Sequence, residues 1–446
     1  MSLLVESSLS ERTCAQKIFD AHLVNYLEDE FIGAIQVDRV FCHEITTPSA
    51  ILELQDRHLD SVFDNSKIKA VIDHVSPAKD SKTALQGKIL REWARKNDIE
   101  FFDIGRGGVC HALFPENGFI EPGFVTVMGD SHTCTYGAFA SLSFGIGTTD
   151  LAVAIRKGIC RLSRPQTIKI ELSGHLKKGV FAKDVILFLI SQIGVNGATG
   201  KVLEFSGSII DSFSMESRMT LCNMAVECGA TTGICNVDLT TIEYLWPFIK
   251  NRYENEQAAL QDFSQWNSDL SCEYDEILKF DLSNLEPMVT FSYKPDCVKT
   301  VGHMSDIKVN QVFIGSCTNG RIEDLRVCAD IIKQYEQKNG KAQVCDGVRA
   351  IVVPATSMVY KQALSEGLIA LFVNAGFCVS NPSCAACIGM SCGVLAEGEV
   401  CASTTNRNFY GRMGKGGMIH LVSPATATST ALAGYITNFD FNSKDD

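Results

Sequence analysis

The sequence predicts an α/β protein whose sheets are built mainly from parallel strands. Short apolar runs rich in β-branched residues alternate along the chain with helical patterns. Several of these runs end abruptly in polar residues, as strands do where they leave a sheet. A chain of 446 residues is too long to fold around one small hydrophobic core, so we expect two or three domains.

Four apolar runs show this pattern most clearly, in chain order. They are residues 69–72 before Asp73-His74, 124–128 before Gly129-Asp130-Ser131-His132, 312–314 before Gly315-Ser316-Cys317, and 350–353 before Pro354-Ala355-Thr356. Open α/β sheets bind their ligands beyond the carboxyl ends of the strands. The repeated placement of reactive residues at such ends predicts one shared site.

The segment 236–284 differs from the rest of the chain. It carries mixed charge, two of the three tryptophans and no candidate catalytic residue. We expect it to be helical and connecting, with a domain boundary near its end.

The net charge and the absence of signal-peptide and membrane-span patterns argue against several classes of protein. The formal charge of −12, from 40 basic and 52 acidic residues, disfavours nucleic acid and anionic membrane surfaces as partners. The first residues lack a basic region followed by an apolar run, and no stretch approaches the length of a membrane span. We therefore expect a cytoplasmic protein whose 18 cysteines stay free or bind metal.

Three cysteines suggest a metal centre. Cys317 lies in a loop of small residues, and Cys384 and Cys387 form a C-x-x-C. A lone C-x-x-C fits a redox dithiol, a zinc site or an iron–sulfur site. No second C-x-x-C completes a zinc site, and Cys317 favours a 4Fe–4S cluster held by three thiolates. Such a cluster leaves one iron open to act as a Lewis acid, whereas most clusters have four cysteine ligands and carry electrons.

The other cysteines are expected to pack. Cys378 and Cys392 are close enough in sequence to be rival ligands, but packing is the simpler expectation. Buried small hydrophobes are expected at Cys14, Cys160, Cys222, Cys328 and Cys401.

Histidines at predicted strand ends are candidates for proton transfer. Asp73-His74 and Asp130-Ser131-His132 each pair a carboxylate with an imidazole, which fixes the tautomer and raises basicity. Two further candidates are His111, after a glycine-rich turn, and His43, after an apolar run. A single histidine is more often structural than catalytic, and we expect a structural role for His58, His175, His303 and His420.

Two arginines are candidates for binding an anionic substrate. Arg407 and Arg412 lie in a loop of small and polar residues, where guanidinium groups suit bidentate binding of carboxylates. The alternative is a solvated basic loop, but Asn406, Asn408 and Gly411 favour a tight, hydrogen-bonded turn.

Two weaker patterns lie between the strong ones. Asn223 and Glu227 are four residues apart, which places them on one face of a helix. Gly145 and Gly147 lack the third glycine of a nucleotide loop, so we expect tight packing at a helix start.

Together these motifs resemble the aconitase superfamily, and within it the large subunits of 3-isopropylmalate dehydratase. The similar segments span nearly the whole chain in family order: 73–74, 129–133, 144–148, 221–224, 313–319, 384–387 and 403–409. The resemblance implies three α/β/α domains, at 1–165, 166–282 and 283–446, packed around a 4Fe–4S cluster.

The resemblance also implies roles for individual residues. The cluster ligands would be Cys317, Cys384 and Cys387, with Asn223, Asn319 and Asn406 orienting them. The catalytic residues would be Asp73, His74, His111, Asp130, His132 and Glu227. Substrate would be bound by His43, Ser131, Arg407 and Arg412. Relatives often have a glycine where this chain has Ser383, so the backbone of the C-x-x-C loop is expected to differ.

The implied activity is that of a hydro-lyase that isomerises 2-isopropylmalate to 3-isopropylmalate through an unsaturated intermediate, in leucine biosynthesis. Homocitrate, citramalate and dimethylmalate are alternative substrates. A redox or iron-sensing cluster protein and an RNA-binding relative are alternatives of other classes. The swivelling fourth domain of aconitases is not found in the sequence, so a separate small subunit is expected to supply that domain and its serine base.

Overall fold

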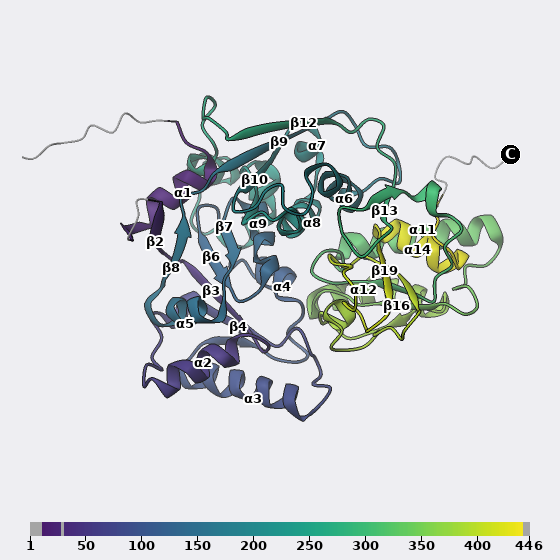
Figure 1. Cartoon of the computed structure of the whole chain (residues 1–446), viewed down its shortest axis with the longest axis horizontal. Helices are drawn as coiled ribbons and strands as arrows, with labels where there is room; N and C mark the ends of the chain where they lie inside the picture. The colour runs from purple at the N-terminus through teal and green to yellow at the C-terminus, as the bar shows by residue number, and fades with distance from the viewer. Residues whose placement is uncertain (1–10, 28–30, 440–446) are drawn as a thin grey trace, which may run out of the picture.

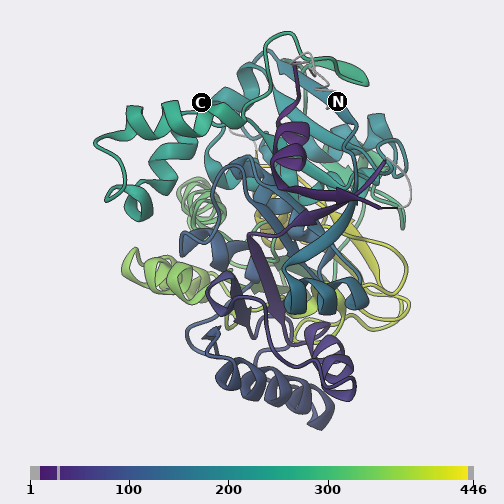
Figure 2. The ribbon, with the colours of Figure 1, turned by 90° about the vertical axis from the view of Figure 1, so that its left-hand side faces the viewer.

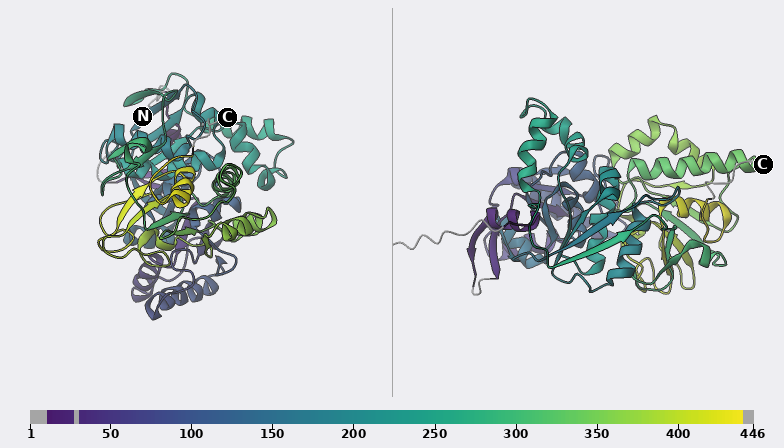
Figure 3. Two further views of the ribbon diagram at one scale, coloured as in Figure 1. Left: turned by 90° about the vertical axis from the view of Figure 1, so that its right-hand side faces the viewer. Right: turned by 90° about the horizontal axis from the view of Figure 1, so that it is seen from above.

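The computed structural model describes residues 11–27 and 31–439. Three parallel sheets form the body of the molecule, and two small antiparallel sheets join them. Residues beyond about 285 form a lobe at one end of the long axis (Figure 1). The view from above shows this lobe beside the other two sheets (Figure 3). The predicted α/β class with parallel sheets is confirmed, while the three domain boundaries stay a prediction.

The first sheet has the strand order β5-β4-β3-β6-β7, and all its pairs are parallel. Its strands are β3 (Arg39–His43), β4 (Ile68–Val71), β5 (Glu100–Phe102), β6 (Val125–Met128) and β7 (Leu142–Gly145). Its helices are α2 (Thr47–Asp56), α3 (Ser81–Lys96), α4 (Cys110–Glu116) and α5 (Thr148–Lys157). Gly147 caps α5, so the expected helix start after the two glycines is confirmed.

The second sheet has the order β11-β10-β9-β12 and is also fully parallel. Its strands are β9 (Thr167–Ser173), β10 (Val202–Ser206), β11 (Thr232–Cys235) and β12 (Glu276–Asp281). Its helices are α6 (Ala182–Ile193), α7 (Ser208–Ser212), α8 (Met215–Met224), α9 (Leu239–Ile249) and α10 (Glu256–Phe263).

The segment 236–284 is only partly as expected. Helices α9 and α10 are present and project from the body of the molecule (Figure 2). The segment then ends in β12, an edge strand parallel to β9, where only helix was expected. No residue of β12 is fully buried, so an edge position explains why its sequence lacks the apolar run of an inner strand.

The third sheet has the order β17-β16-β15-β18-β19 and is parallel throughout. Its strands are β15 (Gln311–Ile314), β16 (Arg349–Val352), β17 (Cys378–Val379), β18 (Val400–Ser403) and β19 (Met418–Leu421). Its helices are α11 (Ile322–Asn339), α12 (Ser357–Ser365), α13 (Leu368–Asn374) and α14 (Pro424–Ala433).

Smaller elements connect the three sheets. One antiparallel sheet contains β1 (Leu23–Tyr26), β2 (Ile32–Gln36) and β8 (Ile159–Ser163), and the other β13 (Met288–Thr290) and β14 (Val298–Thr300). Helix α1 covers Cys14–His22. The 3-10 helices are η1 (Asn65–Lys67), η2 (Ser131–Phe139), η3 (Ala225–Cys228), η4 (Ser264–Trp266), η5 (Val301–Met304) and η6 (Ala385–Ile388).

All three parallel sheets share one topological feature. In each, the strand order reverses once: between β3 and β6 in the first sheet, between β9 and β12 in the second, and between β15 and β18 in the third. Loops that leave neighbouring strands at such a reversal diverge to opposite faces of the sheet and leave a crevice between them. The crevices of the first and third sheets are therefore flanked by the loops that follow His43, Met128, Ile314 and Ser403.

Most cysteines are buried, but two expectations were wrong. The five cysteines expected in the core are buried. Cys378 and Cys392 are exposed and do not pack in the core, and the Cys392 thiol lies 3.3 Å from the Ser380 hydroxyl. None of the helices in the described ranges combines the length and apolarity needed to cross a bilayer.

A half-buried ion pair between α1 and the loop after β2 gives a stability prediction. His22 Nε2 lies 2.8 Å from Asp38 Oδ2, and His22 Nδ1 lies 2.8 Å from the Ile18 carbonyl. Burial alone would lower the pKa of His22, but the hydrogen bond and charge of Asp38 outweigh it and raise that pKa above 6.5. Despite its burial, Asp38 has a pKa below 3.8 because of His22 and the Val125 amide.

We expect His22→Gln to lower the melting temperature most between about pH 4 and about pH 6.5. The stabilisation from His22 is complete below its unfolded pKa and is lost as pH rises through the raised folded pKa. The stabilisation from Asp38 is lost as pH falls through its lowered pKa. Thermal melts of both proteins across pH check this, with the exposed His175→Gln as control. A melting difference that grew towards pH 9 would contradict it.

Candidate active site

One cavity of about 230 Å³ gathers most of the predicted site residues. The predicted residues lining it are His43, Asp73, His74, His111, Asp130, Ser131, His132, Cys317, Cys384, Cys387, Asn406, Arg407 and Arg412. The remaining lining residues are Ile45, Thr46, Val109, Cys110, Gly129 and Ile388. A larger open groove of about 920 Å³ near Trp266 contains none of the predicted residues.

The Asp73-His74 pair is fixed in place at the end of β4. Both carboxylate oxygens of Glu44 accept backbone N–H bonds, from Asp73 at 3.1 Å and from Val75 at 2.7 Å. The Asp73 carboxylate contacts His74 Nδ1 and accepts the Cys110 N–H at 3.1 Å. These contacts leave His74 with one orientation, in which its Nε2 faces the cavity.

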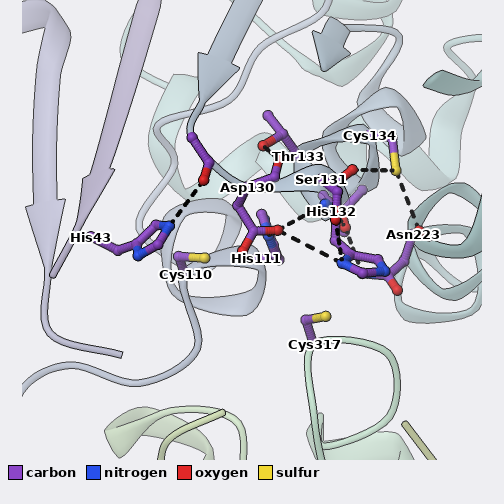
Figure 4. A network of polar contacts seen from close by, with 12 residues as sticks. His43, Cys110, His111, Asp130, Ser131, His132, Thr133, Cys134, Asn223 and Cys317 are labelled. Carbon is purple, nitrogen blue, oxygen red and sulfur yellow. Dashed lines mark hydrogen bonds and ion pairs between the residues drawn. The ribbon is translucent and has the colours of Figure 1, made fainter. Parts of the chain in front are cut away.

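Asp130 is the hub of the site. Its carboxylate lies 3.0 Å from His111 Nε2 and 3.3 Å from His74 Nε2. It also accepts the His132 backbone N–H at 2.8 Å, which caps η2. Figure 4 shows Asp130 between the imidazoles of His111 and His132. One carboxylate therefore organises imidazoles from the loop after β4, from α4 and from η2.

Gly145 permits the close approach on which this hub depends. A Cβ at Gly145 would lie 2.5 Å from the Asp130 carbonyl oxygen and 2.9 Å from the Ser131 Cα. Both contacts are to backbone, so the Asp130 loop would have to move. The glycine is thus needed for the position of the loop and plays no part in a nucleotide site.

A chain of charged groups links the three parts of the molecule. His132 Nε2 lies 3.1 Å from Glu227 Oε1, and the same oxygen accepts the Arg407 Nε–H at 2.8 Å. Glu227 lies in η3, so the expected placement of Asn223 and Glu227 on one helical face was wrong, because α8 ends at Met224. The tighter turn aims Glu227 at His132 and Arg407.

Burial and charge divide the imidazoles into two kinds. Burial opposes the charge on His74, but Asp73 and Asp130 raise its pKa well above the usual value. Burial likewise opposes the charge on His132, whose pKa is nonetheless raised by Asp130 and Glu227. Burial lowers the pKa of His43 to about 4, helped by the nearby His74. The surroundings thus favour the charged form of His74 and His132 and the neutral form of His43.

The three cysteines lie on loops of the third sheet and face the imidazoles around Asp130. Figure 4 shows the loop of Cys317 facing the histidines from the opposite side. Cys317 follows Ser316, which has a left-handed backbone (φ 78°). The Cys384 N–H donates to the Asp73 carbonyl at 2.9 Å and so joins the third sheet to the first. All three cysteines are buried.

Hydrogen-bond donors surround the sulfurs. Asn406 Nδ2 donates to Cys317 Sγ at 3.1 Å, and the Ser316 hydroxyl to Cys387 Sγ at 3.5 Å. Arg412 Nη2 lies 3.9 Å from Cys387 Sγ. The hydrogen bond from Cys384 holds the pKa of the Cys387 thiol well below its usual value, and burial only partly opposes this. Burial raises the pKa of Cys317 to about 11, and the hydrogen bond to Cys387 raises the pKa of Cys384 well above its usual value. The surroundings thus favour a thiolate at Cys387 over the other two cysteines.

Two predicted asparagines lie behind the cavity. Asn223 accepts from the Thr318 hydroxyl at 3.1 Å and donates to the Thr135 hydroxyl at 2.8 Å, so it supports the Cys317 loop. Asn319 Nδ2 donates to Asp324 at 2.9 Å, and the residue lines a separate small cavity. Asn319 therefore does not line the cavity that gathers most of the predicted residues, and its role stays a prediction.

The fourth predicted strand end does not contribute to the site. Thr356 caps α12 and donates to Glu116 at 2.8 Å, outside the cavity. Sequence reasoning also gave no role to Glu44, the carboxylate that fixes Asp73. Its position next to His43 in a run of buried residues was the available signal.

Four side chains could be mistaken for a second metal site. Donor atoms of His43, Glu44, Asp73 and His74 lie within 4.8 Å of one another. Both Glu44 oxygens already accept backbone N–H bonds, and Asp73 bridges His74 and Cys110. We assign this group to orienting the imidazoles.

These features define an α/β enzyme with a combined thiol and imidazole site at the reversal points of two parallel sheets. The sequence model of the aconitase family (aconitate hydratase) matches residues 16–304 and 298–434. The chain belongs to the aconitase family.

Curated relatives agree with this membership, and one solved structure shares the fold. The 3-isopropylmalate dehydratase large subunit of Desulfosudis oleivorans is 62% identical over 96% of this chain and 97% of its own length. The protein of the same name from Geobacter metallireducens is 59% identical, over 96% and 98%. The holo-form of Thermococcus kodakaraensis aconitase X shares the fold, with a TM-score of 0.51 and 11% identity over 96% of this chain and 93% of that one.

Proposed function

We propose that the chain is the large subunit of a hydro-lyase that isomerises 2-isopropylmalate to 3-isopropylmalate, a step of leucine biosynthesis. The observation that carries the proposal is one cavity lined by three thiols, a carboxylate hub of imidazoles and two arginines. Relatives 59–62% identical carry the name of that large subunit. Homocitrate, citramalate and dimethylmalate are the alternative substrates.

Family membership implies a 4Fe–4S cluster, and the residues present fit one. Cys317, Cys384 and Cys387 would hold it, because they are buried and meet at one cavity. Asn406 and Ser316 donate to sulfur, as do the groups that orient the thiolate ligands of a metal. Three thiolates leave one iron open, and the bound cluster would supply a Lewis acid for the substrate hydroxyl and carboxylate.

The chain's own residues would bind the substrate and move protons. Arg407 and Arg412 would hold substrate carboxylates and offset their charge. His74 or His132, whose charged forms are favoured by the neighbouring carboxylates, would give a proton to the departing hydroxyl, so that it leaves as water. Removal of the neighbouring C–H proton completes the double bond, and water then adds with the hydroxyl one carbon over.

The group that takes the C–H proton is expected on another chain. We nominate no serine of this chain as the base, and relatives are named large subunits, which indicates a separate small subunit. That subunit would carry the swivelling domain and a serine base. It would also shape the pocket for the substrate side chain.

Reconstitution with the partner tests the proposal. The chain is loaded anaerobically with iron and sulfide, mixed with the small subunit from the same genome, and supplied with 2-isopropylmalate, homocitrate or citramalate. Absorbance of the unsaturated intermediate is followed. Turnover of 2-isopropylmalate only with both subunits and iron is the expected result. A cluster-loaded pair that turned over none of the three acids would favour the redox or sensing alternative.

Arg412→Lys is expected to leave the cluster in place and to weaken substrate binding. A lysine keeps the charge but cannot make the planar bidentate contact of a guanidinium group. We expect KM to rise about 10- to 100-fold, the cost of one or two charge-assisted hydrogen bonds. Iron content and KM are measured together, with the exposed Arg161→Lys as control. A variant with the wild-type KM would remove Arg412 from the substrate site.

A further inference from the structure

Lys183 is a fully buried lysine outside the cavity and outside the predicted site. It lies in the first turn of α6 and is 1% exposed. Its ammonium donates to the carbonyls of Thr404 at 2.8 Å and of Thr405 at 2.6 Å, more than 220 residues along the chain. A charge this deeply buried is costly unless it is paired or hydrogen-bonded. Among the described residues, no carboxylate lies within 4.0 Å of this ammonium.

The start of α6 is itself fixed in place. Asp184, the next residue, accepts the Met288 N–H at 2.8 Å and the Phe181 N–H at 2.9 Å. The bond to Met288 ties the helix to β13, which lies in the C-terminal lobe, and the bond to Phe181 caps the helix. The ammonium of Lys183 is therefore held at a defined point from which it can locate another segment.

The segment that Lys183 holds leads directly into the site. Thr404 also bonds through its hydroxyl to the backbone of Gly315, in the Cys317 loop. The next residue, Asn406, donates to Cys317 Sγ at 3.1 Å. One residue further, Arg407 donates to Glu227 at 2.8 Å. A shift of the two carbonyls would move both side chains, because only one or two residues separate them.

We propose that Lys183 is a positioning residue of the reaction: through the Thr404 and Thr405 carbonyls it places Asn406 on the thiol site and Arg407 on the substrate. This inference rests on the proposed function. No direct contact of Lys183 with substrate or cluster is implied. Its removal should therefore act on two separate properties, retention of iron through Asn406 and substrate binding through Arg407.

Lys183→Met tests the inference, because methionine keeps most of the side chain's length and volume but donates no hydrogen bond. The exposed Lys177→Met, six residues earlier, is the matched control. Three quantities are measured: deuterium uptake of the peptide covering residues 400–412 in the apo chain, the half-life of bound iron on dilution into chelator, and KM with the small subunit present.

Faster deuterium uptake, a shorter iron half-life and a KM raised at least about 10-fold are expected for Lys183→Met, with Lys177→Met unchanged. Wild-type values of all three in a folded Lys183→Met would overturn the inference. If that variant is insoluble, Lys183→Gln is measured in the same way, since its shorter amide loses at least one of the two hydrogen bonds. Wild-type values in Lys183→Gln would overturn the inference equally. If the proposed function fails, the wild-type pair itself is inactive. Deuterium uptake requires no turnover, so it still tests the role of Lys183 in that case.

Discussion

Cys384→Ala is expected to abolish stable cluster binding and to reduce turnover at least about 10³-fold, because a metal Lewis acid supplies several kcal/mol and each 1.36 kcal/mol is tenfold in rate. Cys384 lies at the cavity and is tied through its N–H to the Asp73 carbonyl. Alanine keeps that backbone bond and removes only the thiol. Iron and sulfide content, the visible spectrum and turnover are measured after anaerobic reconstitution.

Cys392→Ala is the matched control for this result. Cys392 follows the C-x-x-C closely but is exposed, so its loss should change neither iron content nor turnover. A full complement of iron and sulfide in Cys384→Ala would show that the ligand set is wrong. Loss of iron in Cys392→Ala would instead make that cysteine a rival ligand.

Asp130→Asn is the second large effect that we expect. The Asp130 carboxylate accepts from His111, His74 and the His132 amide, whereas a neutral amide accepts through one oxygen only. We expect turnover to fall about 10²- to 10⁴-fold, the range of positioned acid–base catalysis. Iron content should stay at the wild-type level, because Asp130 holds no sulfur.

The same substitution at an exposed aspartate, Asp211→Asn, is the control. It should leave both turnover and iron content at the wild-type level. The test of mechanism is the pH profile of the residual activity. The Asp130 carboxylate raises the pKa values of His74 and His132. Without it, the pKa of the imidazole that donates the proton should fall, so activity should be lost at a lower pH than in the wild type. An unchanged rate and profile would exclude Asp130 as the organiser of the imidazoles.

Much of the architecture could be predicted because the inner strands are apolar and end at reactive residues. The runs before Asp73, Asp130 and Cys317 are strands β4, β6 and β15, as expected. Strand β12 escaped prediction because an edge strand with one solvated face carries no apolar run. Strand order was also out of reach, since it depends on pairing between segments far apart in the sequence.

The site was predicted as a set of residues rather than as a geometry. The sequence pairs His132 with Asp130, but the bond from His132 to Glu227 spans 95 residues and has no local signal. The role of Asp130 as a hub depends on the neighbouring positions of β3, β4 and β6 in one sheet. Lys183 was missed because a lysine in the first turn of a helix is ordinarily solvent-exposed.

The chain of contacts from His132 through Glu227 to Arg407 has a consequence for biosynthesis of the protein. Translation delivers the imidazoles first, the linking carboxylate about a hundred residues later, and Cys384, Cys387 and both arginines only near the end. Cys317 is therefore made well before the two cysteines with which it shares the cavity. The thiol site is complete only after residues of all three sheets have been synthesised.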